Sequence, residues 1–157
     1  MYPSLHKTVA DKVIDDIGVT HFRQHDTDRN IINEHNSHVM GRFRCPKDSC
    51  SSGGWTSKKV AIRIRDYGGG EYNAVVFNQR CSSCESLGWL TLDEDSYVER
   101  VAYRLKFWAG VKMERPAHSG REGPPHRSDL CEGCRLGYCQ ERGGLEGSRG
   151  SGRGWLM

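Results

Sequence analysis

The first hydrophobic pattern along the chain has a helical period. One face is formed by residues that recur every four positions, Leu5, Val9, Val13 and Ile17. Such a stripe is typical of an amphipathic α-helix. Ser4 can cap the helix and Gly18 can end it, so the pattern predicts a helix over residues 4–17. Residues 19–38 are polar and show no clear period, which predicts a loop with at most a short helical turn.

A two-residue period begins at Val39 and predicts strands. In residues 57–67 the apolar side chains Val60, Ile62 and Ile64 alternate with the basic side chains Lys59, Arg63 and Arg65. The three glycines at 68–70 predict a turn, and residues 71–81 return as a second strand. The pattern therefore predicts a β-hairpin with one basic face.

The clearest helical pattern lies at residues 93–110. Its apolar stripe is formed by Val98, Val101, Ala102, Leu105 and Ala109. Asp95 or Ser96 can cap this helix, and Gly110 can stop it. Helices beside a small antiparallel sheet indicate an α+β fold.

Composition leaves little material for a hydrophobic core. Only 36% of the 157 residues are hydrophobic, and the mean hydropathy is −0.71. A structural zinc contributes an apparent binding free energy of about 10–16 kcal/mol. That matches the whole stability of an ordinary domain, about 5–15 kcal/mol. Bound metal would therefore decide whether this chain folds.

Composition also divides the chain into three regions. Residues 1–38 hold the predicted helix and polar loop, and residues 39–140 hold the sheet, the second helix and all the cysteines. A linker rich in proline and glycine is expected over residues 112–125. The last region, residues 141–157, is rich in Gly, Arg and Ser and is expected to be disordered.

The sequence contains no run of 18 apolar residues, so no transmembrane helix is expected. Its first residues lack the order of a secretory signal peptide. A cytoplasmic or nuclear location is therefore expected, where cysteines serve as thiolate metal ligands rather than forming disulfides.

Seven cysteines carry the candidate chemistry of the chain. Two pairs, Cys81 with Cys84 and Cys131 with Cys134, are separated by two residues, a spacing that lets one tight turn present both sulfurs to a zinc ion. The pair Cys45 and Cys50 is separated by four residues, which also lies in the usual range.

Tetrahedral zinc requires four ligands, and His126 completes the count. It lies five residues before Cys131, so one set consists of His126, Cys131, Cys134 and Cys139. The other set consists of Cys45, Cys50, Cys81 and Cys84. Two zinc ions per chain are therefore expected. The remaining histidines lack paired spacing with cysteines and are expected on the surface or in loops: His6, His21, His25, His35, His38 and His118.

The ligand sets give no sign of catalysis. A catalytic zinc keeps an open position beside three protein ligands, whereas both sets here close at four. Glu132 lies between two cysteines, but the rest of the zinc-deaminase pattern is missing. The chain is therefore not expected to be an enzyme.

At these residues the chain resembles the three-CxxC zinc-finger family, especially its fungal members. The resemblance covers residues 41–139 and includes the segments "GRFRCPKDSC", "YNAVVFNQRCSSC" and "GPPHRSDLCEGCRLGYC". The same type of domain is found in receptor-transporting proteins and resembles a finger of zygote-arrest proteins, which bind mRNA. The resemblance implies that Cys81, Cys84, Cys131 and Cys134 are zinc ligands.

Two functions compete at this point. The first is a protein-interaction or adaptor module, with an unidentified partner, in which Trp55, Trp89 or Trp108 could make contacts. The alternative is binding of RNA or single-stranded nucleic acid. Its phosphate contacts would be Lys58, Lys59, Arg63, Arg65 and Arg80, with Tyr67 or Tyr72 stacked on a base. The tail residues Arg142, Arg149 and Arg153 would add weaker contacts.

Overall fold

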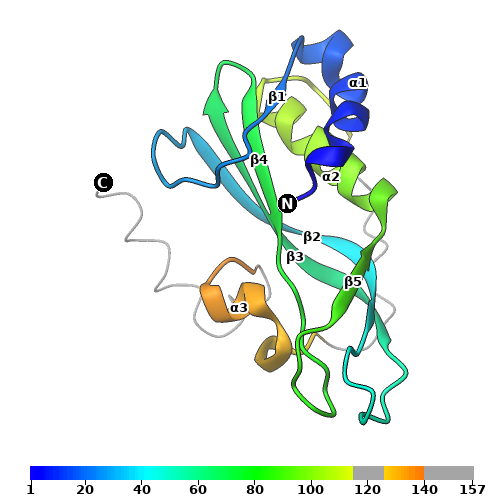
Figure 1. The fold of residues 1–157 in the computed structure, drawn as a ribbon. Helices are drawn as coiled ribbons and strands as arrows, with labels where there is room; N and C mark the ends of the chain where they lie inside the picture. The colour runs from blue at the N-terminus through cyan, green and yellow to red at the C-terminus, as the bar shows by residue number, and fades with distance from the viewer. Residues whose placement is uncertain (115–125, 140–157) are drawn as a thin grey trace.

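The computed structural model describes residues 1–114 and 126–139 and has the predicted α+β fold. Its centre is a five-stranded sheet in the order β1-β4-β3-β2-β5 (Figure 1). The strands are β1 (His21–Phe22), β2 (Asn33–Arg44), β3 (Trp55–Gly68), β4 (Glu71–Val76) and β5 (Trp89–Leu92). All neighbouring strands are antiparallel except β1, which is parallel to β4.

The helices lie at opposite ends of this sheet. At one end, α1 (His6–Ile17) and α2 (Glu94–Trp108) pack against each other, and a 3₁₀ turn, η1 (Pro3–Leu5), precedes α1. At the other end lie η2 (Ser128–Leu130) and the short α3 (Glu132–Leu136) (Figure 1).

The cap of α2 differs from the prediction. Helix α2 begins earlier than either predicted cap, because Asp93 is its N-cap and accepts a hydrogen bond from the backbone N–H of Ser96. None of the helices within residues 1–114 and 126–139 has the length and hydropathy of a membrane span.

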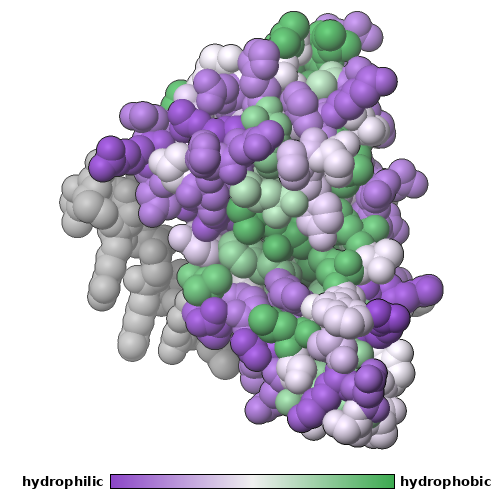
Figure 2. All heavy atoms as spheres, in the orientation of Figure 1, coloured by the Kyte–Doolittle hydropathy of each residue, from purple (hydrophilic) through white to green (hydrophobic). Residues whose placement is uncertain are grey.

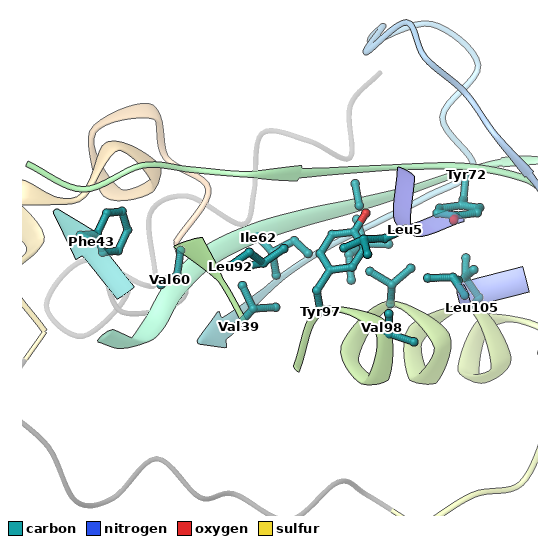
Figure 3. Packing of buried hydrophobic residues seen from close by; sticks show 14 residues of the cluster. Leu5, Val39, Phe43, Val60, Ile62, Tyr72, Leu92, Tyr97, Val98 and Leu105 are labelled. Carbon is teal, nitrogen blue, oxygen red and sulfur yellow. The ribbon is translucent and has the colours of Figure 1, made fainter. Parts of the chain in front are cut away.

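The main hydrophobic core lies between the sheet and the helix pair. Figure 3 shows sheet side chains such as Val39 and Ile62 pointing toward α2, which contributes Tyr97, Val98 and Leu105. Val60, Ile62 and Ile64 are completely buried on this face, as their alternation predicts. The core therefore follows this face of the sheet from the helix pair to Phe43, two residues before Cys45.

The opposite face of β3 carries the predicted basic side chains, but part of this face is covered. Arg63 and Arg65 are only 5% and 3% exposed. Arg65 contacts Glu34, Asp26 and Asp28 at 2.8, 2.9 and 2.9 Å. Alternation shows which side chains share a face, but it does not show which segment covers that face.

Arg63 belongs to the same network. Its guanidinium pairs with Asp26 and lies 4.4 Å above the ring centroid of Tyr138. The acidic partner comes from the segment between β1 and β2, and the aromatic partner from the C-terminal segment. Two distant parts of the chain therefore meet over this face of the sheet.

The prediction of a loop through residue 38 is also wrong in part. Residues 21–22 form β1, and β2 begins at Asn33 rather than at Val39. The first half of β2 is polar because its side chains meet charged groups: Glu34 pairs with Arg65, and His35 accepts a hydrogen bond from Arg104. A strand stabilised in this way has no hydrophobic period to detect.

Candidate metal centres

The first candidate centre, which we call the N-terminal centre, consists of Cys45, Cys50, Cys81 and Cys84. Cys45 follows the last residue of β2, and the backbone N–H of Cys50 donates to the carbonyl of Lys47 at 3.0 Å. The other pair lies between β4 and β5, where the N–H of Glu85 donates to the carbonyl of Cys81 at 2.8 Å. Two turns at the same end of the sheet therefore present two sulfurs each.

The sulfur positions fit a tetrahedral zinc ion. The Sγ atoms of Cys45 and Cys84 are 3.5 Å apart, and those of Cys50 and Cys81 are 3.8 Å apart. A zinc–sulfur bond of about 2.3 Å gives sulfur–sulfur separations of about 3.8 Å in a tetrahedron. All four ligand atoms lie within 4.8 Å of one another. The N-terminal centre can therefore hold one zinc ion.

The thiol chemistry agrees with this geometry. Backbone N–H groups of Cys84 and Ser83 lower the pKa of Cys81 to about 6. At Cys45 a backbone N–H of Lys47 favours the thiolate, but burial and the neighbouring thiols outweigh it and raise the pKa to about 12. The four thiols therefore do not ionise together by themselves. A divalent cation supplies the positive charge that four adjacent thiolates need.

The second candidate centre, which we call the C-terminal centre, consists of His126, Cys131, Cys134 and Cys139. Cys131 is the N-cap of α3, and its Sγ accepts a hydrogen bond from the backbone N–H of Cys134 at 3.4 Å. Gly137 ends the helix with a left-handed φ of 88°. The chain then turns back, and the N–H of Tyr138 donates to the carbonyl of Gly133 at 2.8 Å.

The mixed donor set of the C-terminal centre also fits zinc. Nε2 of His126 lies 3.3 Å from Sγ of Cys134 and 3.6 Å from Sγ of Cys139. Zinc–nitrogen and zinc–sulfur bonds of about 2.0 and 2.3 Å predict about 3.5 Å between such atoms. Hydrogen bonds with the Cys139 and His126 side chains lower the pKa of Cys131 to about 4. The centre therefore favours a thiolate even before metal binds.

The second cysteine turn is fitted closely against the sheet. A Cβ atom added to Gly133 would lie 2.5 Å from Cβ of Ala61 on β3. Ala61, Phe77 and the three cysteines of the C-terminal centre form one buried cluster. Glycine is therefore required at position 133 because it lets the cysteine turn approach β3 closely, in addition to the backbone freedom that it gives the turn.

Arg80 and Glu132 connect the two centres. Arg80 immediately precedes Cys81, and its Nε lies 2.8 Å from Oε1 of Glu132, which immediately follows Cys131. Arg135 and then Arg80 lower the pKa of the Glu132 carboxyl. Backbone pairing joins the same segments, because the N–H of Arg80 donates to the carbonyl of Leu130 at 2.8 Å. This ion pair therefore joins a residue next to the N-terminal centre to a residue next to the C-terminal centre.

The predicted nucleic-acid residues have different surroundings. Arg63, Arg65 and Arg80 are engaged in ion pairs, whereas Lys58 is exposed and Lys59 is half-buried.

The predicted stacking residues Tyr67 and Tyr72 are buried, at 9% and 1% exposure. The hydroxyl of Tyr67 donates to the carbonyl of Thr27, and that of Tyr72 is 2.8 Å from Nδ1 of His6. The tail residues Arg142, Arg149 and Arg153 lie outside the described residues.

The three candidate tryptophans also differ in their burial and contacts. Trp55 stacks on Phe43 with ring centroids 5.1 Å apart and donates to Gln79. Trp108 is partly buried against the main core. Trp89 is 55% exposed. Of the three, Trp89 is therefore the one most accessible to a partner.

Several histidines have specific partners that spacing did not indicate. His6 meets Tyr72, and Nε2 of His35 is 2.9 Å from Arg104, so neither is a simple surface residue. His21 and His25 are exposed, as expected, and His118 lies outside the described residues. His38 approaches the C-terminal centre, with its Nε2 3.3 Å from Sγ of Cys139. These two residues are 101 positions apart, which leaves no local signal in the sequence.

A mixed sheet carrying two sets of four thiolate and imidazole ligands defines a zinc-binding protein with two candidate metal centres. Comparison with family models gives the particular class. The three-CxxC zinc-ribbon family, described as a zinc-binding domain, matches residues 38–137. The chain belongs to this family. Comparisons with curated proteins and with solved structures found no match.

Proposed function

We propose that this chain is a protein-interaction module in which two zinc ions have a structural role. The closed ligand sets support this proposal, because four protein ligands at each centre leave no coordination position for a substrate. The module would not be an enzyme. Its thiolate ligands suit a compartment that keeps cysteines reduced, such as the cytosol or the nucleus.

The surface around Trp89 supports an interaction role. Trp89 is 55% exposed and is the first residue of the edge strand β5, and Leu87, two residues earlier in the chain, is 44% exposed. The guanidinium of Arg44 lies 4.6 Å above the ring centroid of Trp89. Exposed tryptophan and arginine are the residues most enriched at binding hot spots.

A hydrophobic band also lies over the sheet. Figure 2 shows hydrophobic residues in a band across the middle of this face, over the sheet labelled β2, β3 and β5 in Figure 1. Hydrophilic residues lie above the band and below it. A hydrophobic centre with a polar rim is the usual anatomy of a protein interface.

The experiment compares two exposed aromatic residues that each carry a stacked arginine. Full-length protein with Trp89→Ala is compared with Phe107→Ala, because Phe107 is 53% exposed and has Arg104 4.7 Å above its ring. Each protein is used to capture partners from native cell extract with and without nuclease. We expect captured proteins that remain after nuclease treatment and that bind the purified protein directly. Trp89→Ala should lose these partners, whereas Phe107→Ala should retain them. Equal retention by both variants would contradict the proposal.

One observation favours nucleic acid as a second candidate. Arg42 and Arg44 are exposed two residues apart on β2, and the strand register places Arg44 directly opposite Trp89. Directly opposed residues project from the same face of a sheet. An exposed indole with neighbouring cations matches the way proteins bind single strands.

A salt-dependent gel shift tests this second candidate. Arg42→Glu with Arg44→Glu is compared with Arg29→Glu, an exposed arginine in the segment between β1 and β2. If the two strand residues neutralise phosphates, the slope of affinity against salt falls by about 0.7 for each single-strand phosphate that the variant no longer binds. Wild-type protein that fails to bind RNA or single-stranded DNA near physiological salt would eliminate this candidate.

A further inference from the structure

His38 lies in the shell around the C-terminal centre. It is half-buried on β2 and pairs in register with Ala61 of β3, which packs in the buried cluster of Cys131, Cys134 and Cys139. Its Nε2 is 3.3 Å from Sγ of Cys139, and its ring centroid is 6.0 Å from that of His126. Two histidines therefore approach one centre from different parts of the chain.

The two rings differ in their relation to the ligand set. Nε2 of His126 belongs to four ligand atoms that all lie within 4.8 Å of one another. Nε2 of His38 is not a member of that set, although it lies within hydrogen-bond range of one sulfur. A tetrahedral site filled by the first four atoms leaves no fifth position. The geometry therefore separates a ligand, His126, from a residue that contacts a ligand.

We propose that His38 is a positioning residue of the C-terminal centre, whose Nε2–H donates a hydrogen bond to the metal-bound Sγ of Cys139. This inference rests on zinc being bound at that centre. A thiolate bound to zinc still accepts hydrogen bonds, and such outer partners fix the orientation of a ligand. His38 thereby fastens the last cysteine of the chain to β2.

The hydrogen bond has two chemical consequences. It draws electron density from the Cys139 sulfur, so the thiolate becomes less reactive toward electrophiles. It also restrains Cys139, which follows α3 and has no regular secondary structure of its own. Loss of outer partners of this kind typically reduces metal affinity by about 10–100-fold. His38→Ala should therefore release zinc to a chelator faster than wild-type protein does.

Cobalt-substituted full-length protein distinguishes this role from simple packing. In His38→Ala we expect the thiolate-to-cobalt charge-transfer band to move to longer wavelength, while two cobalt ions remain bound per chain. His38→Gln, which restores an N–H donor, should return the band toward its wild-type position. His25→Ala, which changes an exposed histidine, should match wild type. An unchanged band and unchanged zinc release in His38→Ala would overturn the proposal.

A second measurement needs no variant and remains available if His38→Ala fails to fold. Long-range ¹H–¹⁵N spectra of the zinc-loaded wild type report which nitrogen of each imidazole ring holds a proton. We expect a proton on Nε2 of His38 and on Nδ1 of His126. An unprotonated Nε2 on His38 would overturn the proposal, and loss of one cobalt ion in His38→Ala would instead make His38 a ligand. A chain without metal at this centre would contradict the zinc assignment itself.

Discussion

The two ends of the sheet are stabilised in different ways. Fourteen buried residues form one hydrophobic cluster, which packs against α1 and α2 at the helical end and continues along the strands to Phe43. At the metal end, the buried cluster has five members, and three of them are cysteines. The comparison shows how a chain of low hydropathy can fold. One large apolar cluster packs against the helices, and at the other end two candidate metal centres lie beside a much smaller cluster.

Removal of metal should produce the largest effect and should affect the two ends unequally. A structural zinc contributes about 10–16 kcal/mol of apparent binding free energy. In chelated protein we expect hydrogen-exchange protection to be lost first in residues 45–54, 81–88 and 130–138, with α2 retaining more of its protection. Cys84→Ser should reproduce the loss at residues 45–54 and 81–88, whereas Ser82→Ala, an exposed change in the same turn, should not. Equal loss at both ends would show that both depend on metal to the same extent.

A cavity at the helical end should lower the stability of the protein without lowering its metal content. Leu105 is 7% exposed in the main core, and Leu→Ala changes in cores typically cost about 2–5 kcal/mol. We expect Leu105→Ala to lower the denaturant midpoint while the protein keeps its full metal content. Leu136→Ala changes a leucine that is 48% exposed at the metal end and should alter stability little. Loss of zinc from Leu105→Ala would show that the two ends are not separable.

The ion-pair network should have a comparable or slightly smaller effect. Arg65 has 3% side-chain exposure, and removing one partner of a buried pair costs about 3–5 kcal/mol. The carboxylates of Asp26 and Glu34 keep 31% and 33% exposure, which places Arg65→Ala near the lower value, about 3 kcal/mol. Lys58→Ala is the control and should change stability by less than about 0.5 kcal/mol. Urea unfolding of both variants measures the difference, and equal midpoints would contradict the network.

The smallest expected effect is a pH dependence at the helical end. Burial, Arg104 and Arg100 lower the pKa of His35 from 6.5 to about 4. Because the folded pKa lies below the unfolded one, the unfolded chain binds the proton more readily. The contribution of neutral His35 is therefore complete above pH 6.5 and declines as the pH falls toward 4.

His35→Gln should flatten this dependence. Denaturant midpoints are compared at several pH values below 7, over the interval in which elemental analysis shows that both proteins retain their metal. A steeper loss of stability in wild type than in the variant is expected. Parallel curves would show that His35 does not contribute.

The sequence was most informative where a structural feature depends only on residues that lie close together in the chain. The periods of residues 4–17 and 57–67 indicated a helix and a strand because each buries one apolar face along its own length. The cysteine spacings likewise pointed to tight turns that present two sulfurs each. These features depend on near neighbours, so they can be read without knowing the fold.

The sequence was least informative where distant segments meet. The burial of Arg65 was not predicted, because nothing near it in the sequence marks Asp26 or Glu34 as partners. The polar first half of β2 was not recognised for the same reason, since Glu34 and His35 are stabilised by arginines on β3 and α2. His38 lies beside Cys139 only through the register of β2 and β3. Such contacts depend on tertiary structure, which no local period encodes.

The metal content of the intact protein shows whether the chain holds two independent zinc centres. Native mass spectrometry of wild-type protein purified without added metal should show two zinc ions per chain. Cys50→Ser and Cys134→Ser should each lower that number to one, because each variant removes one ligand from a different set of four. One zinc in wild type, or loss of both ions in either single variant, would contradict two independent structural centres.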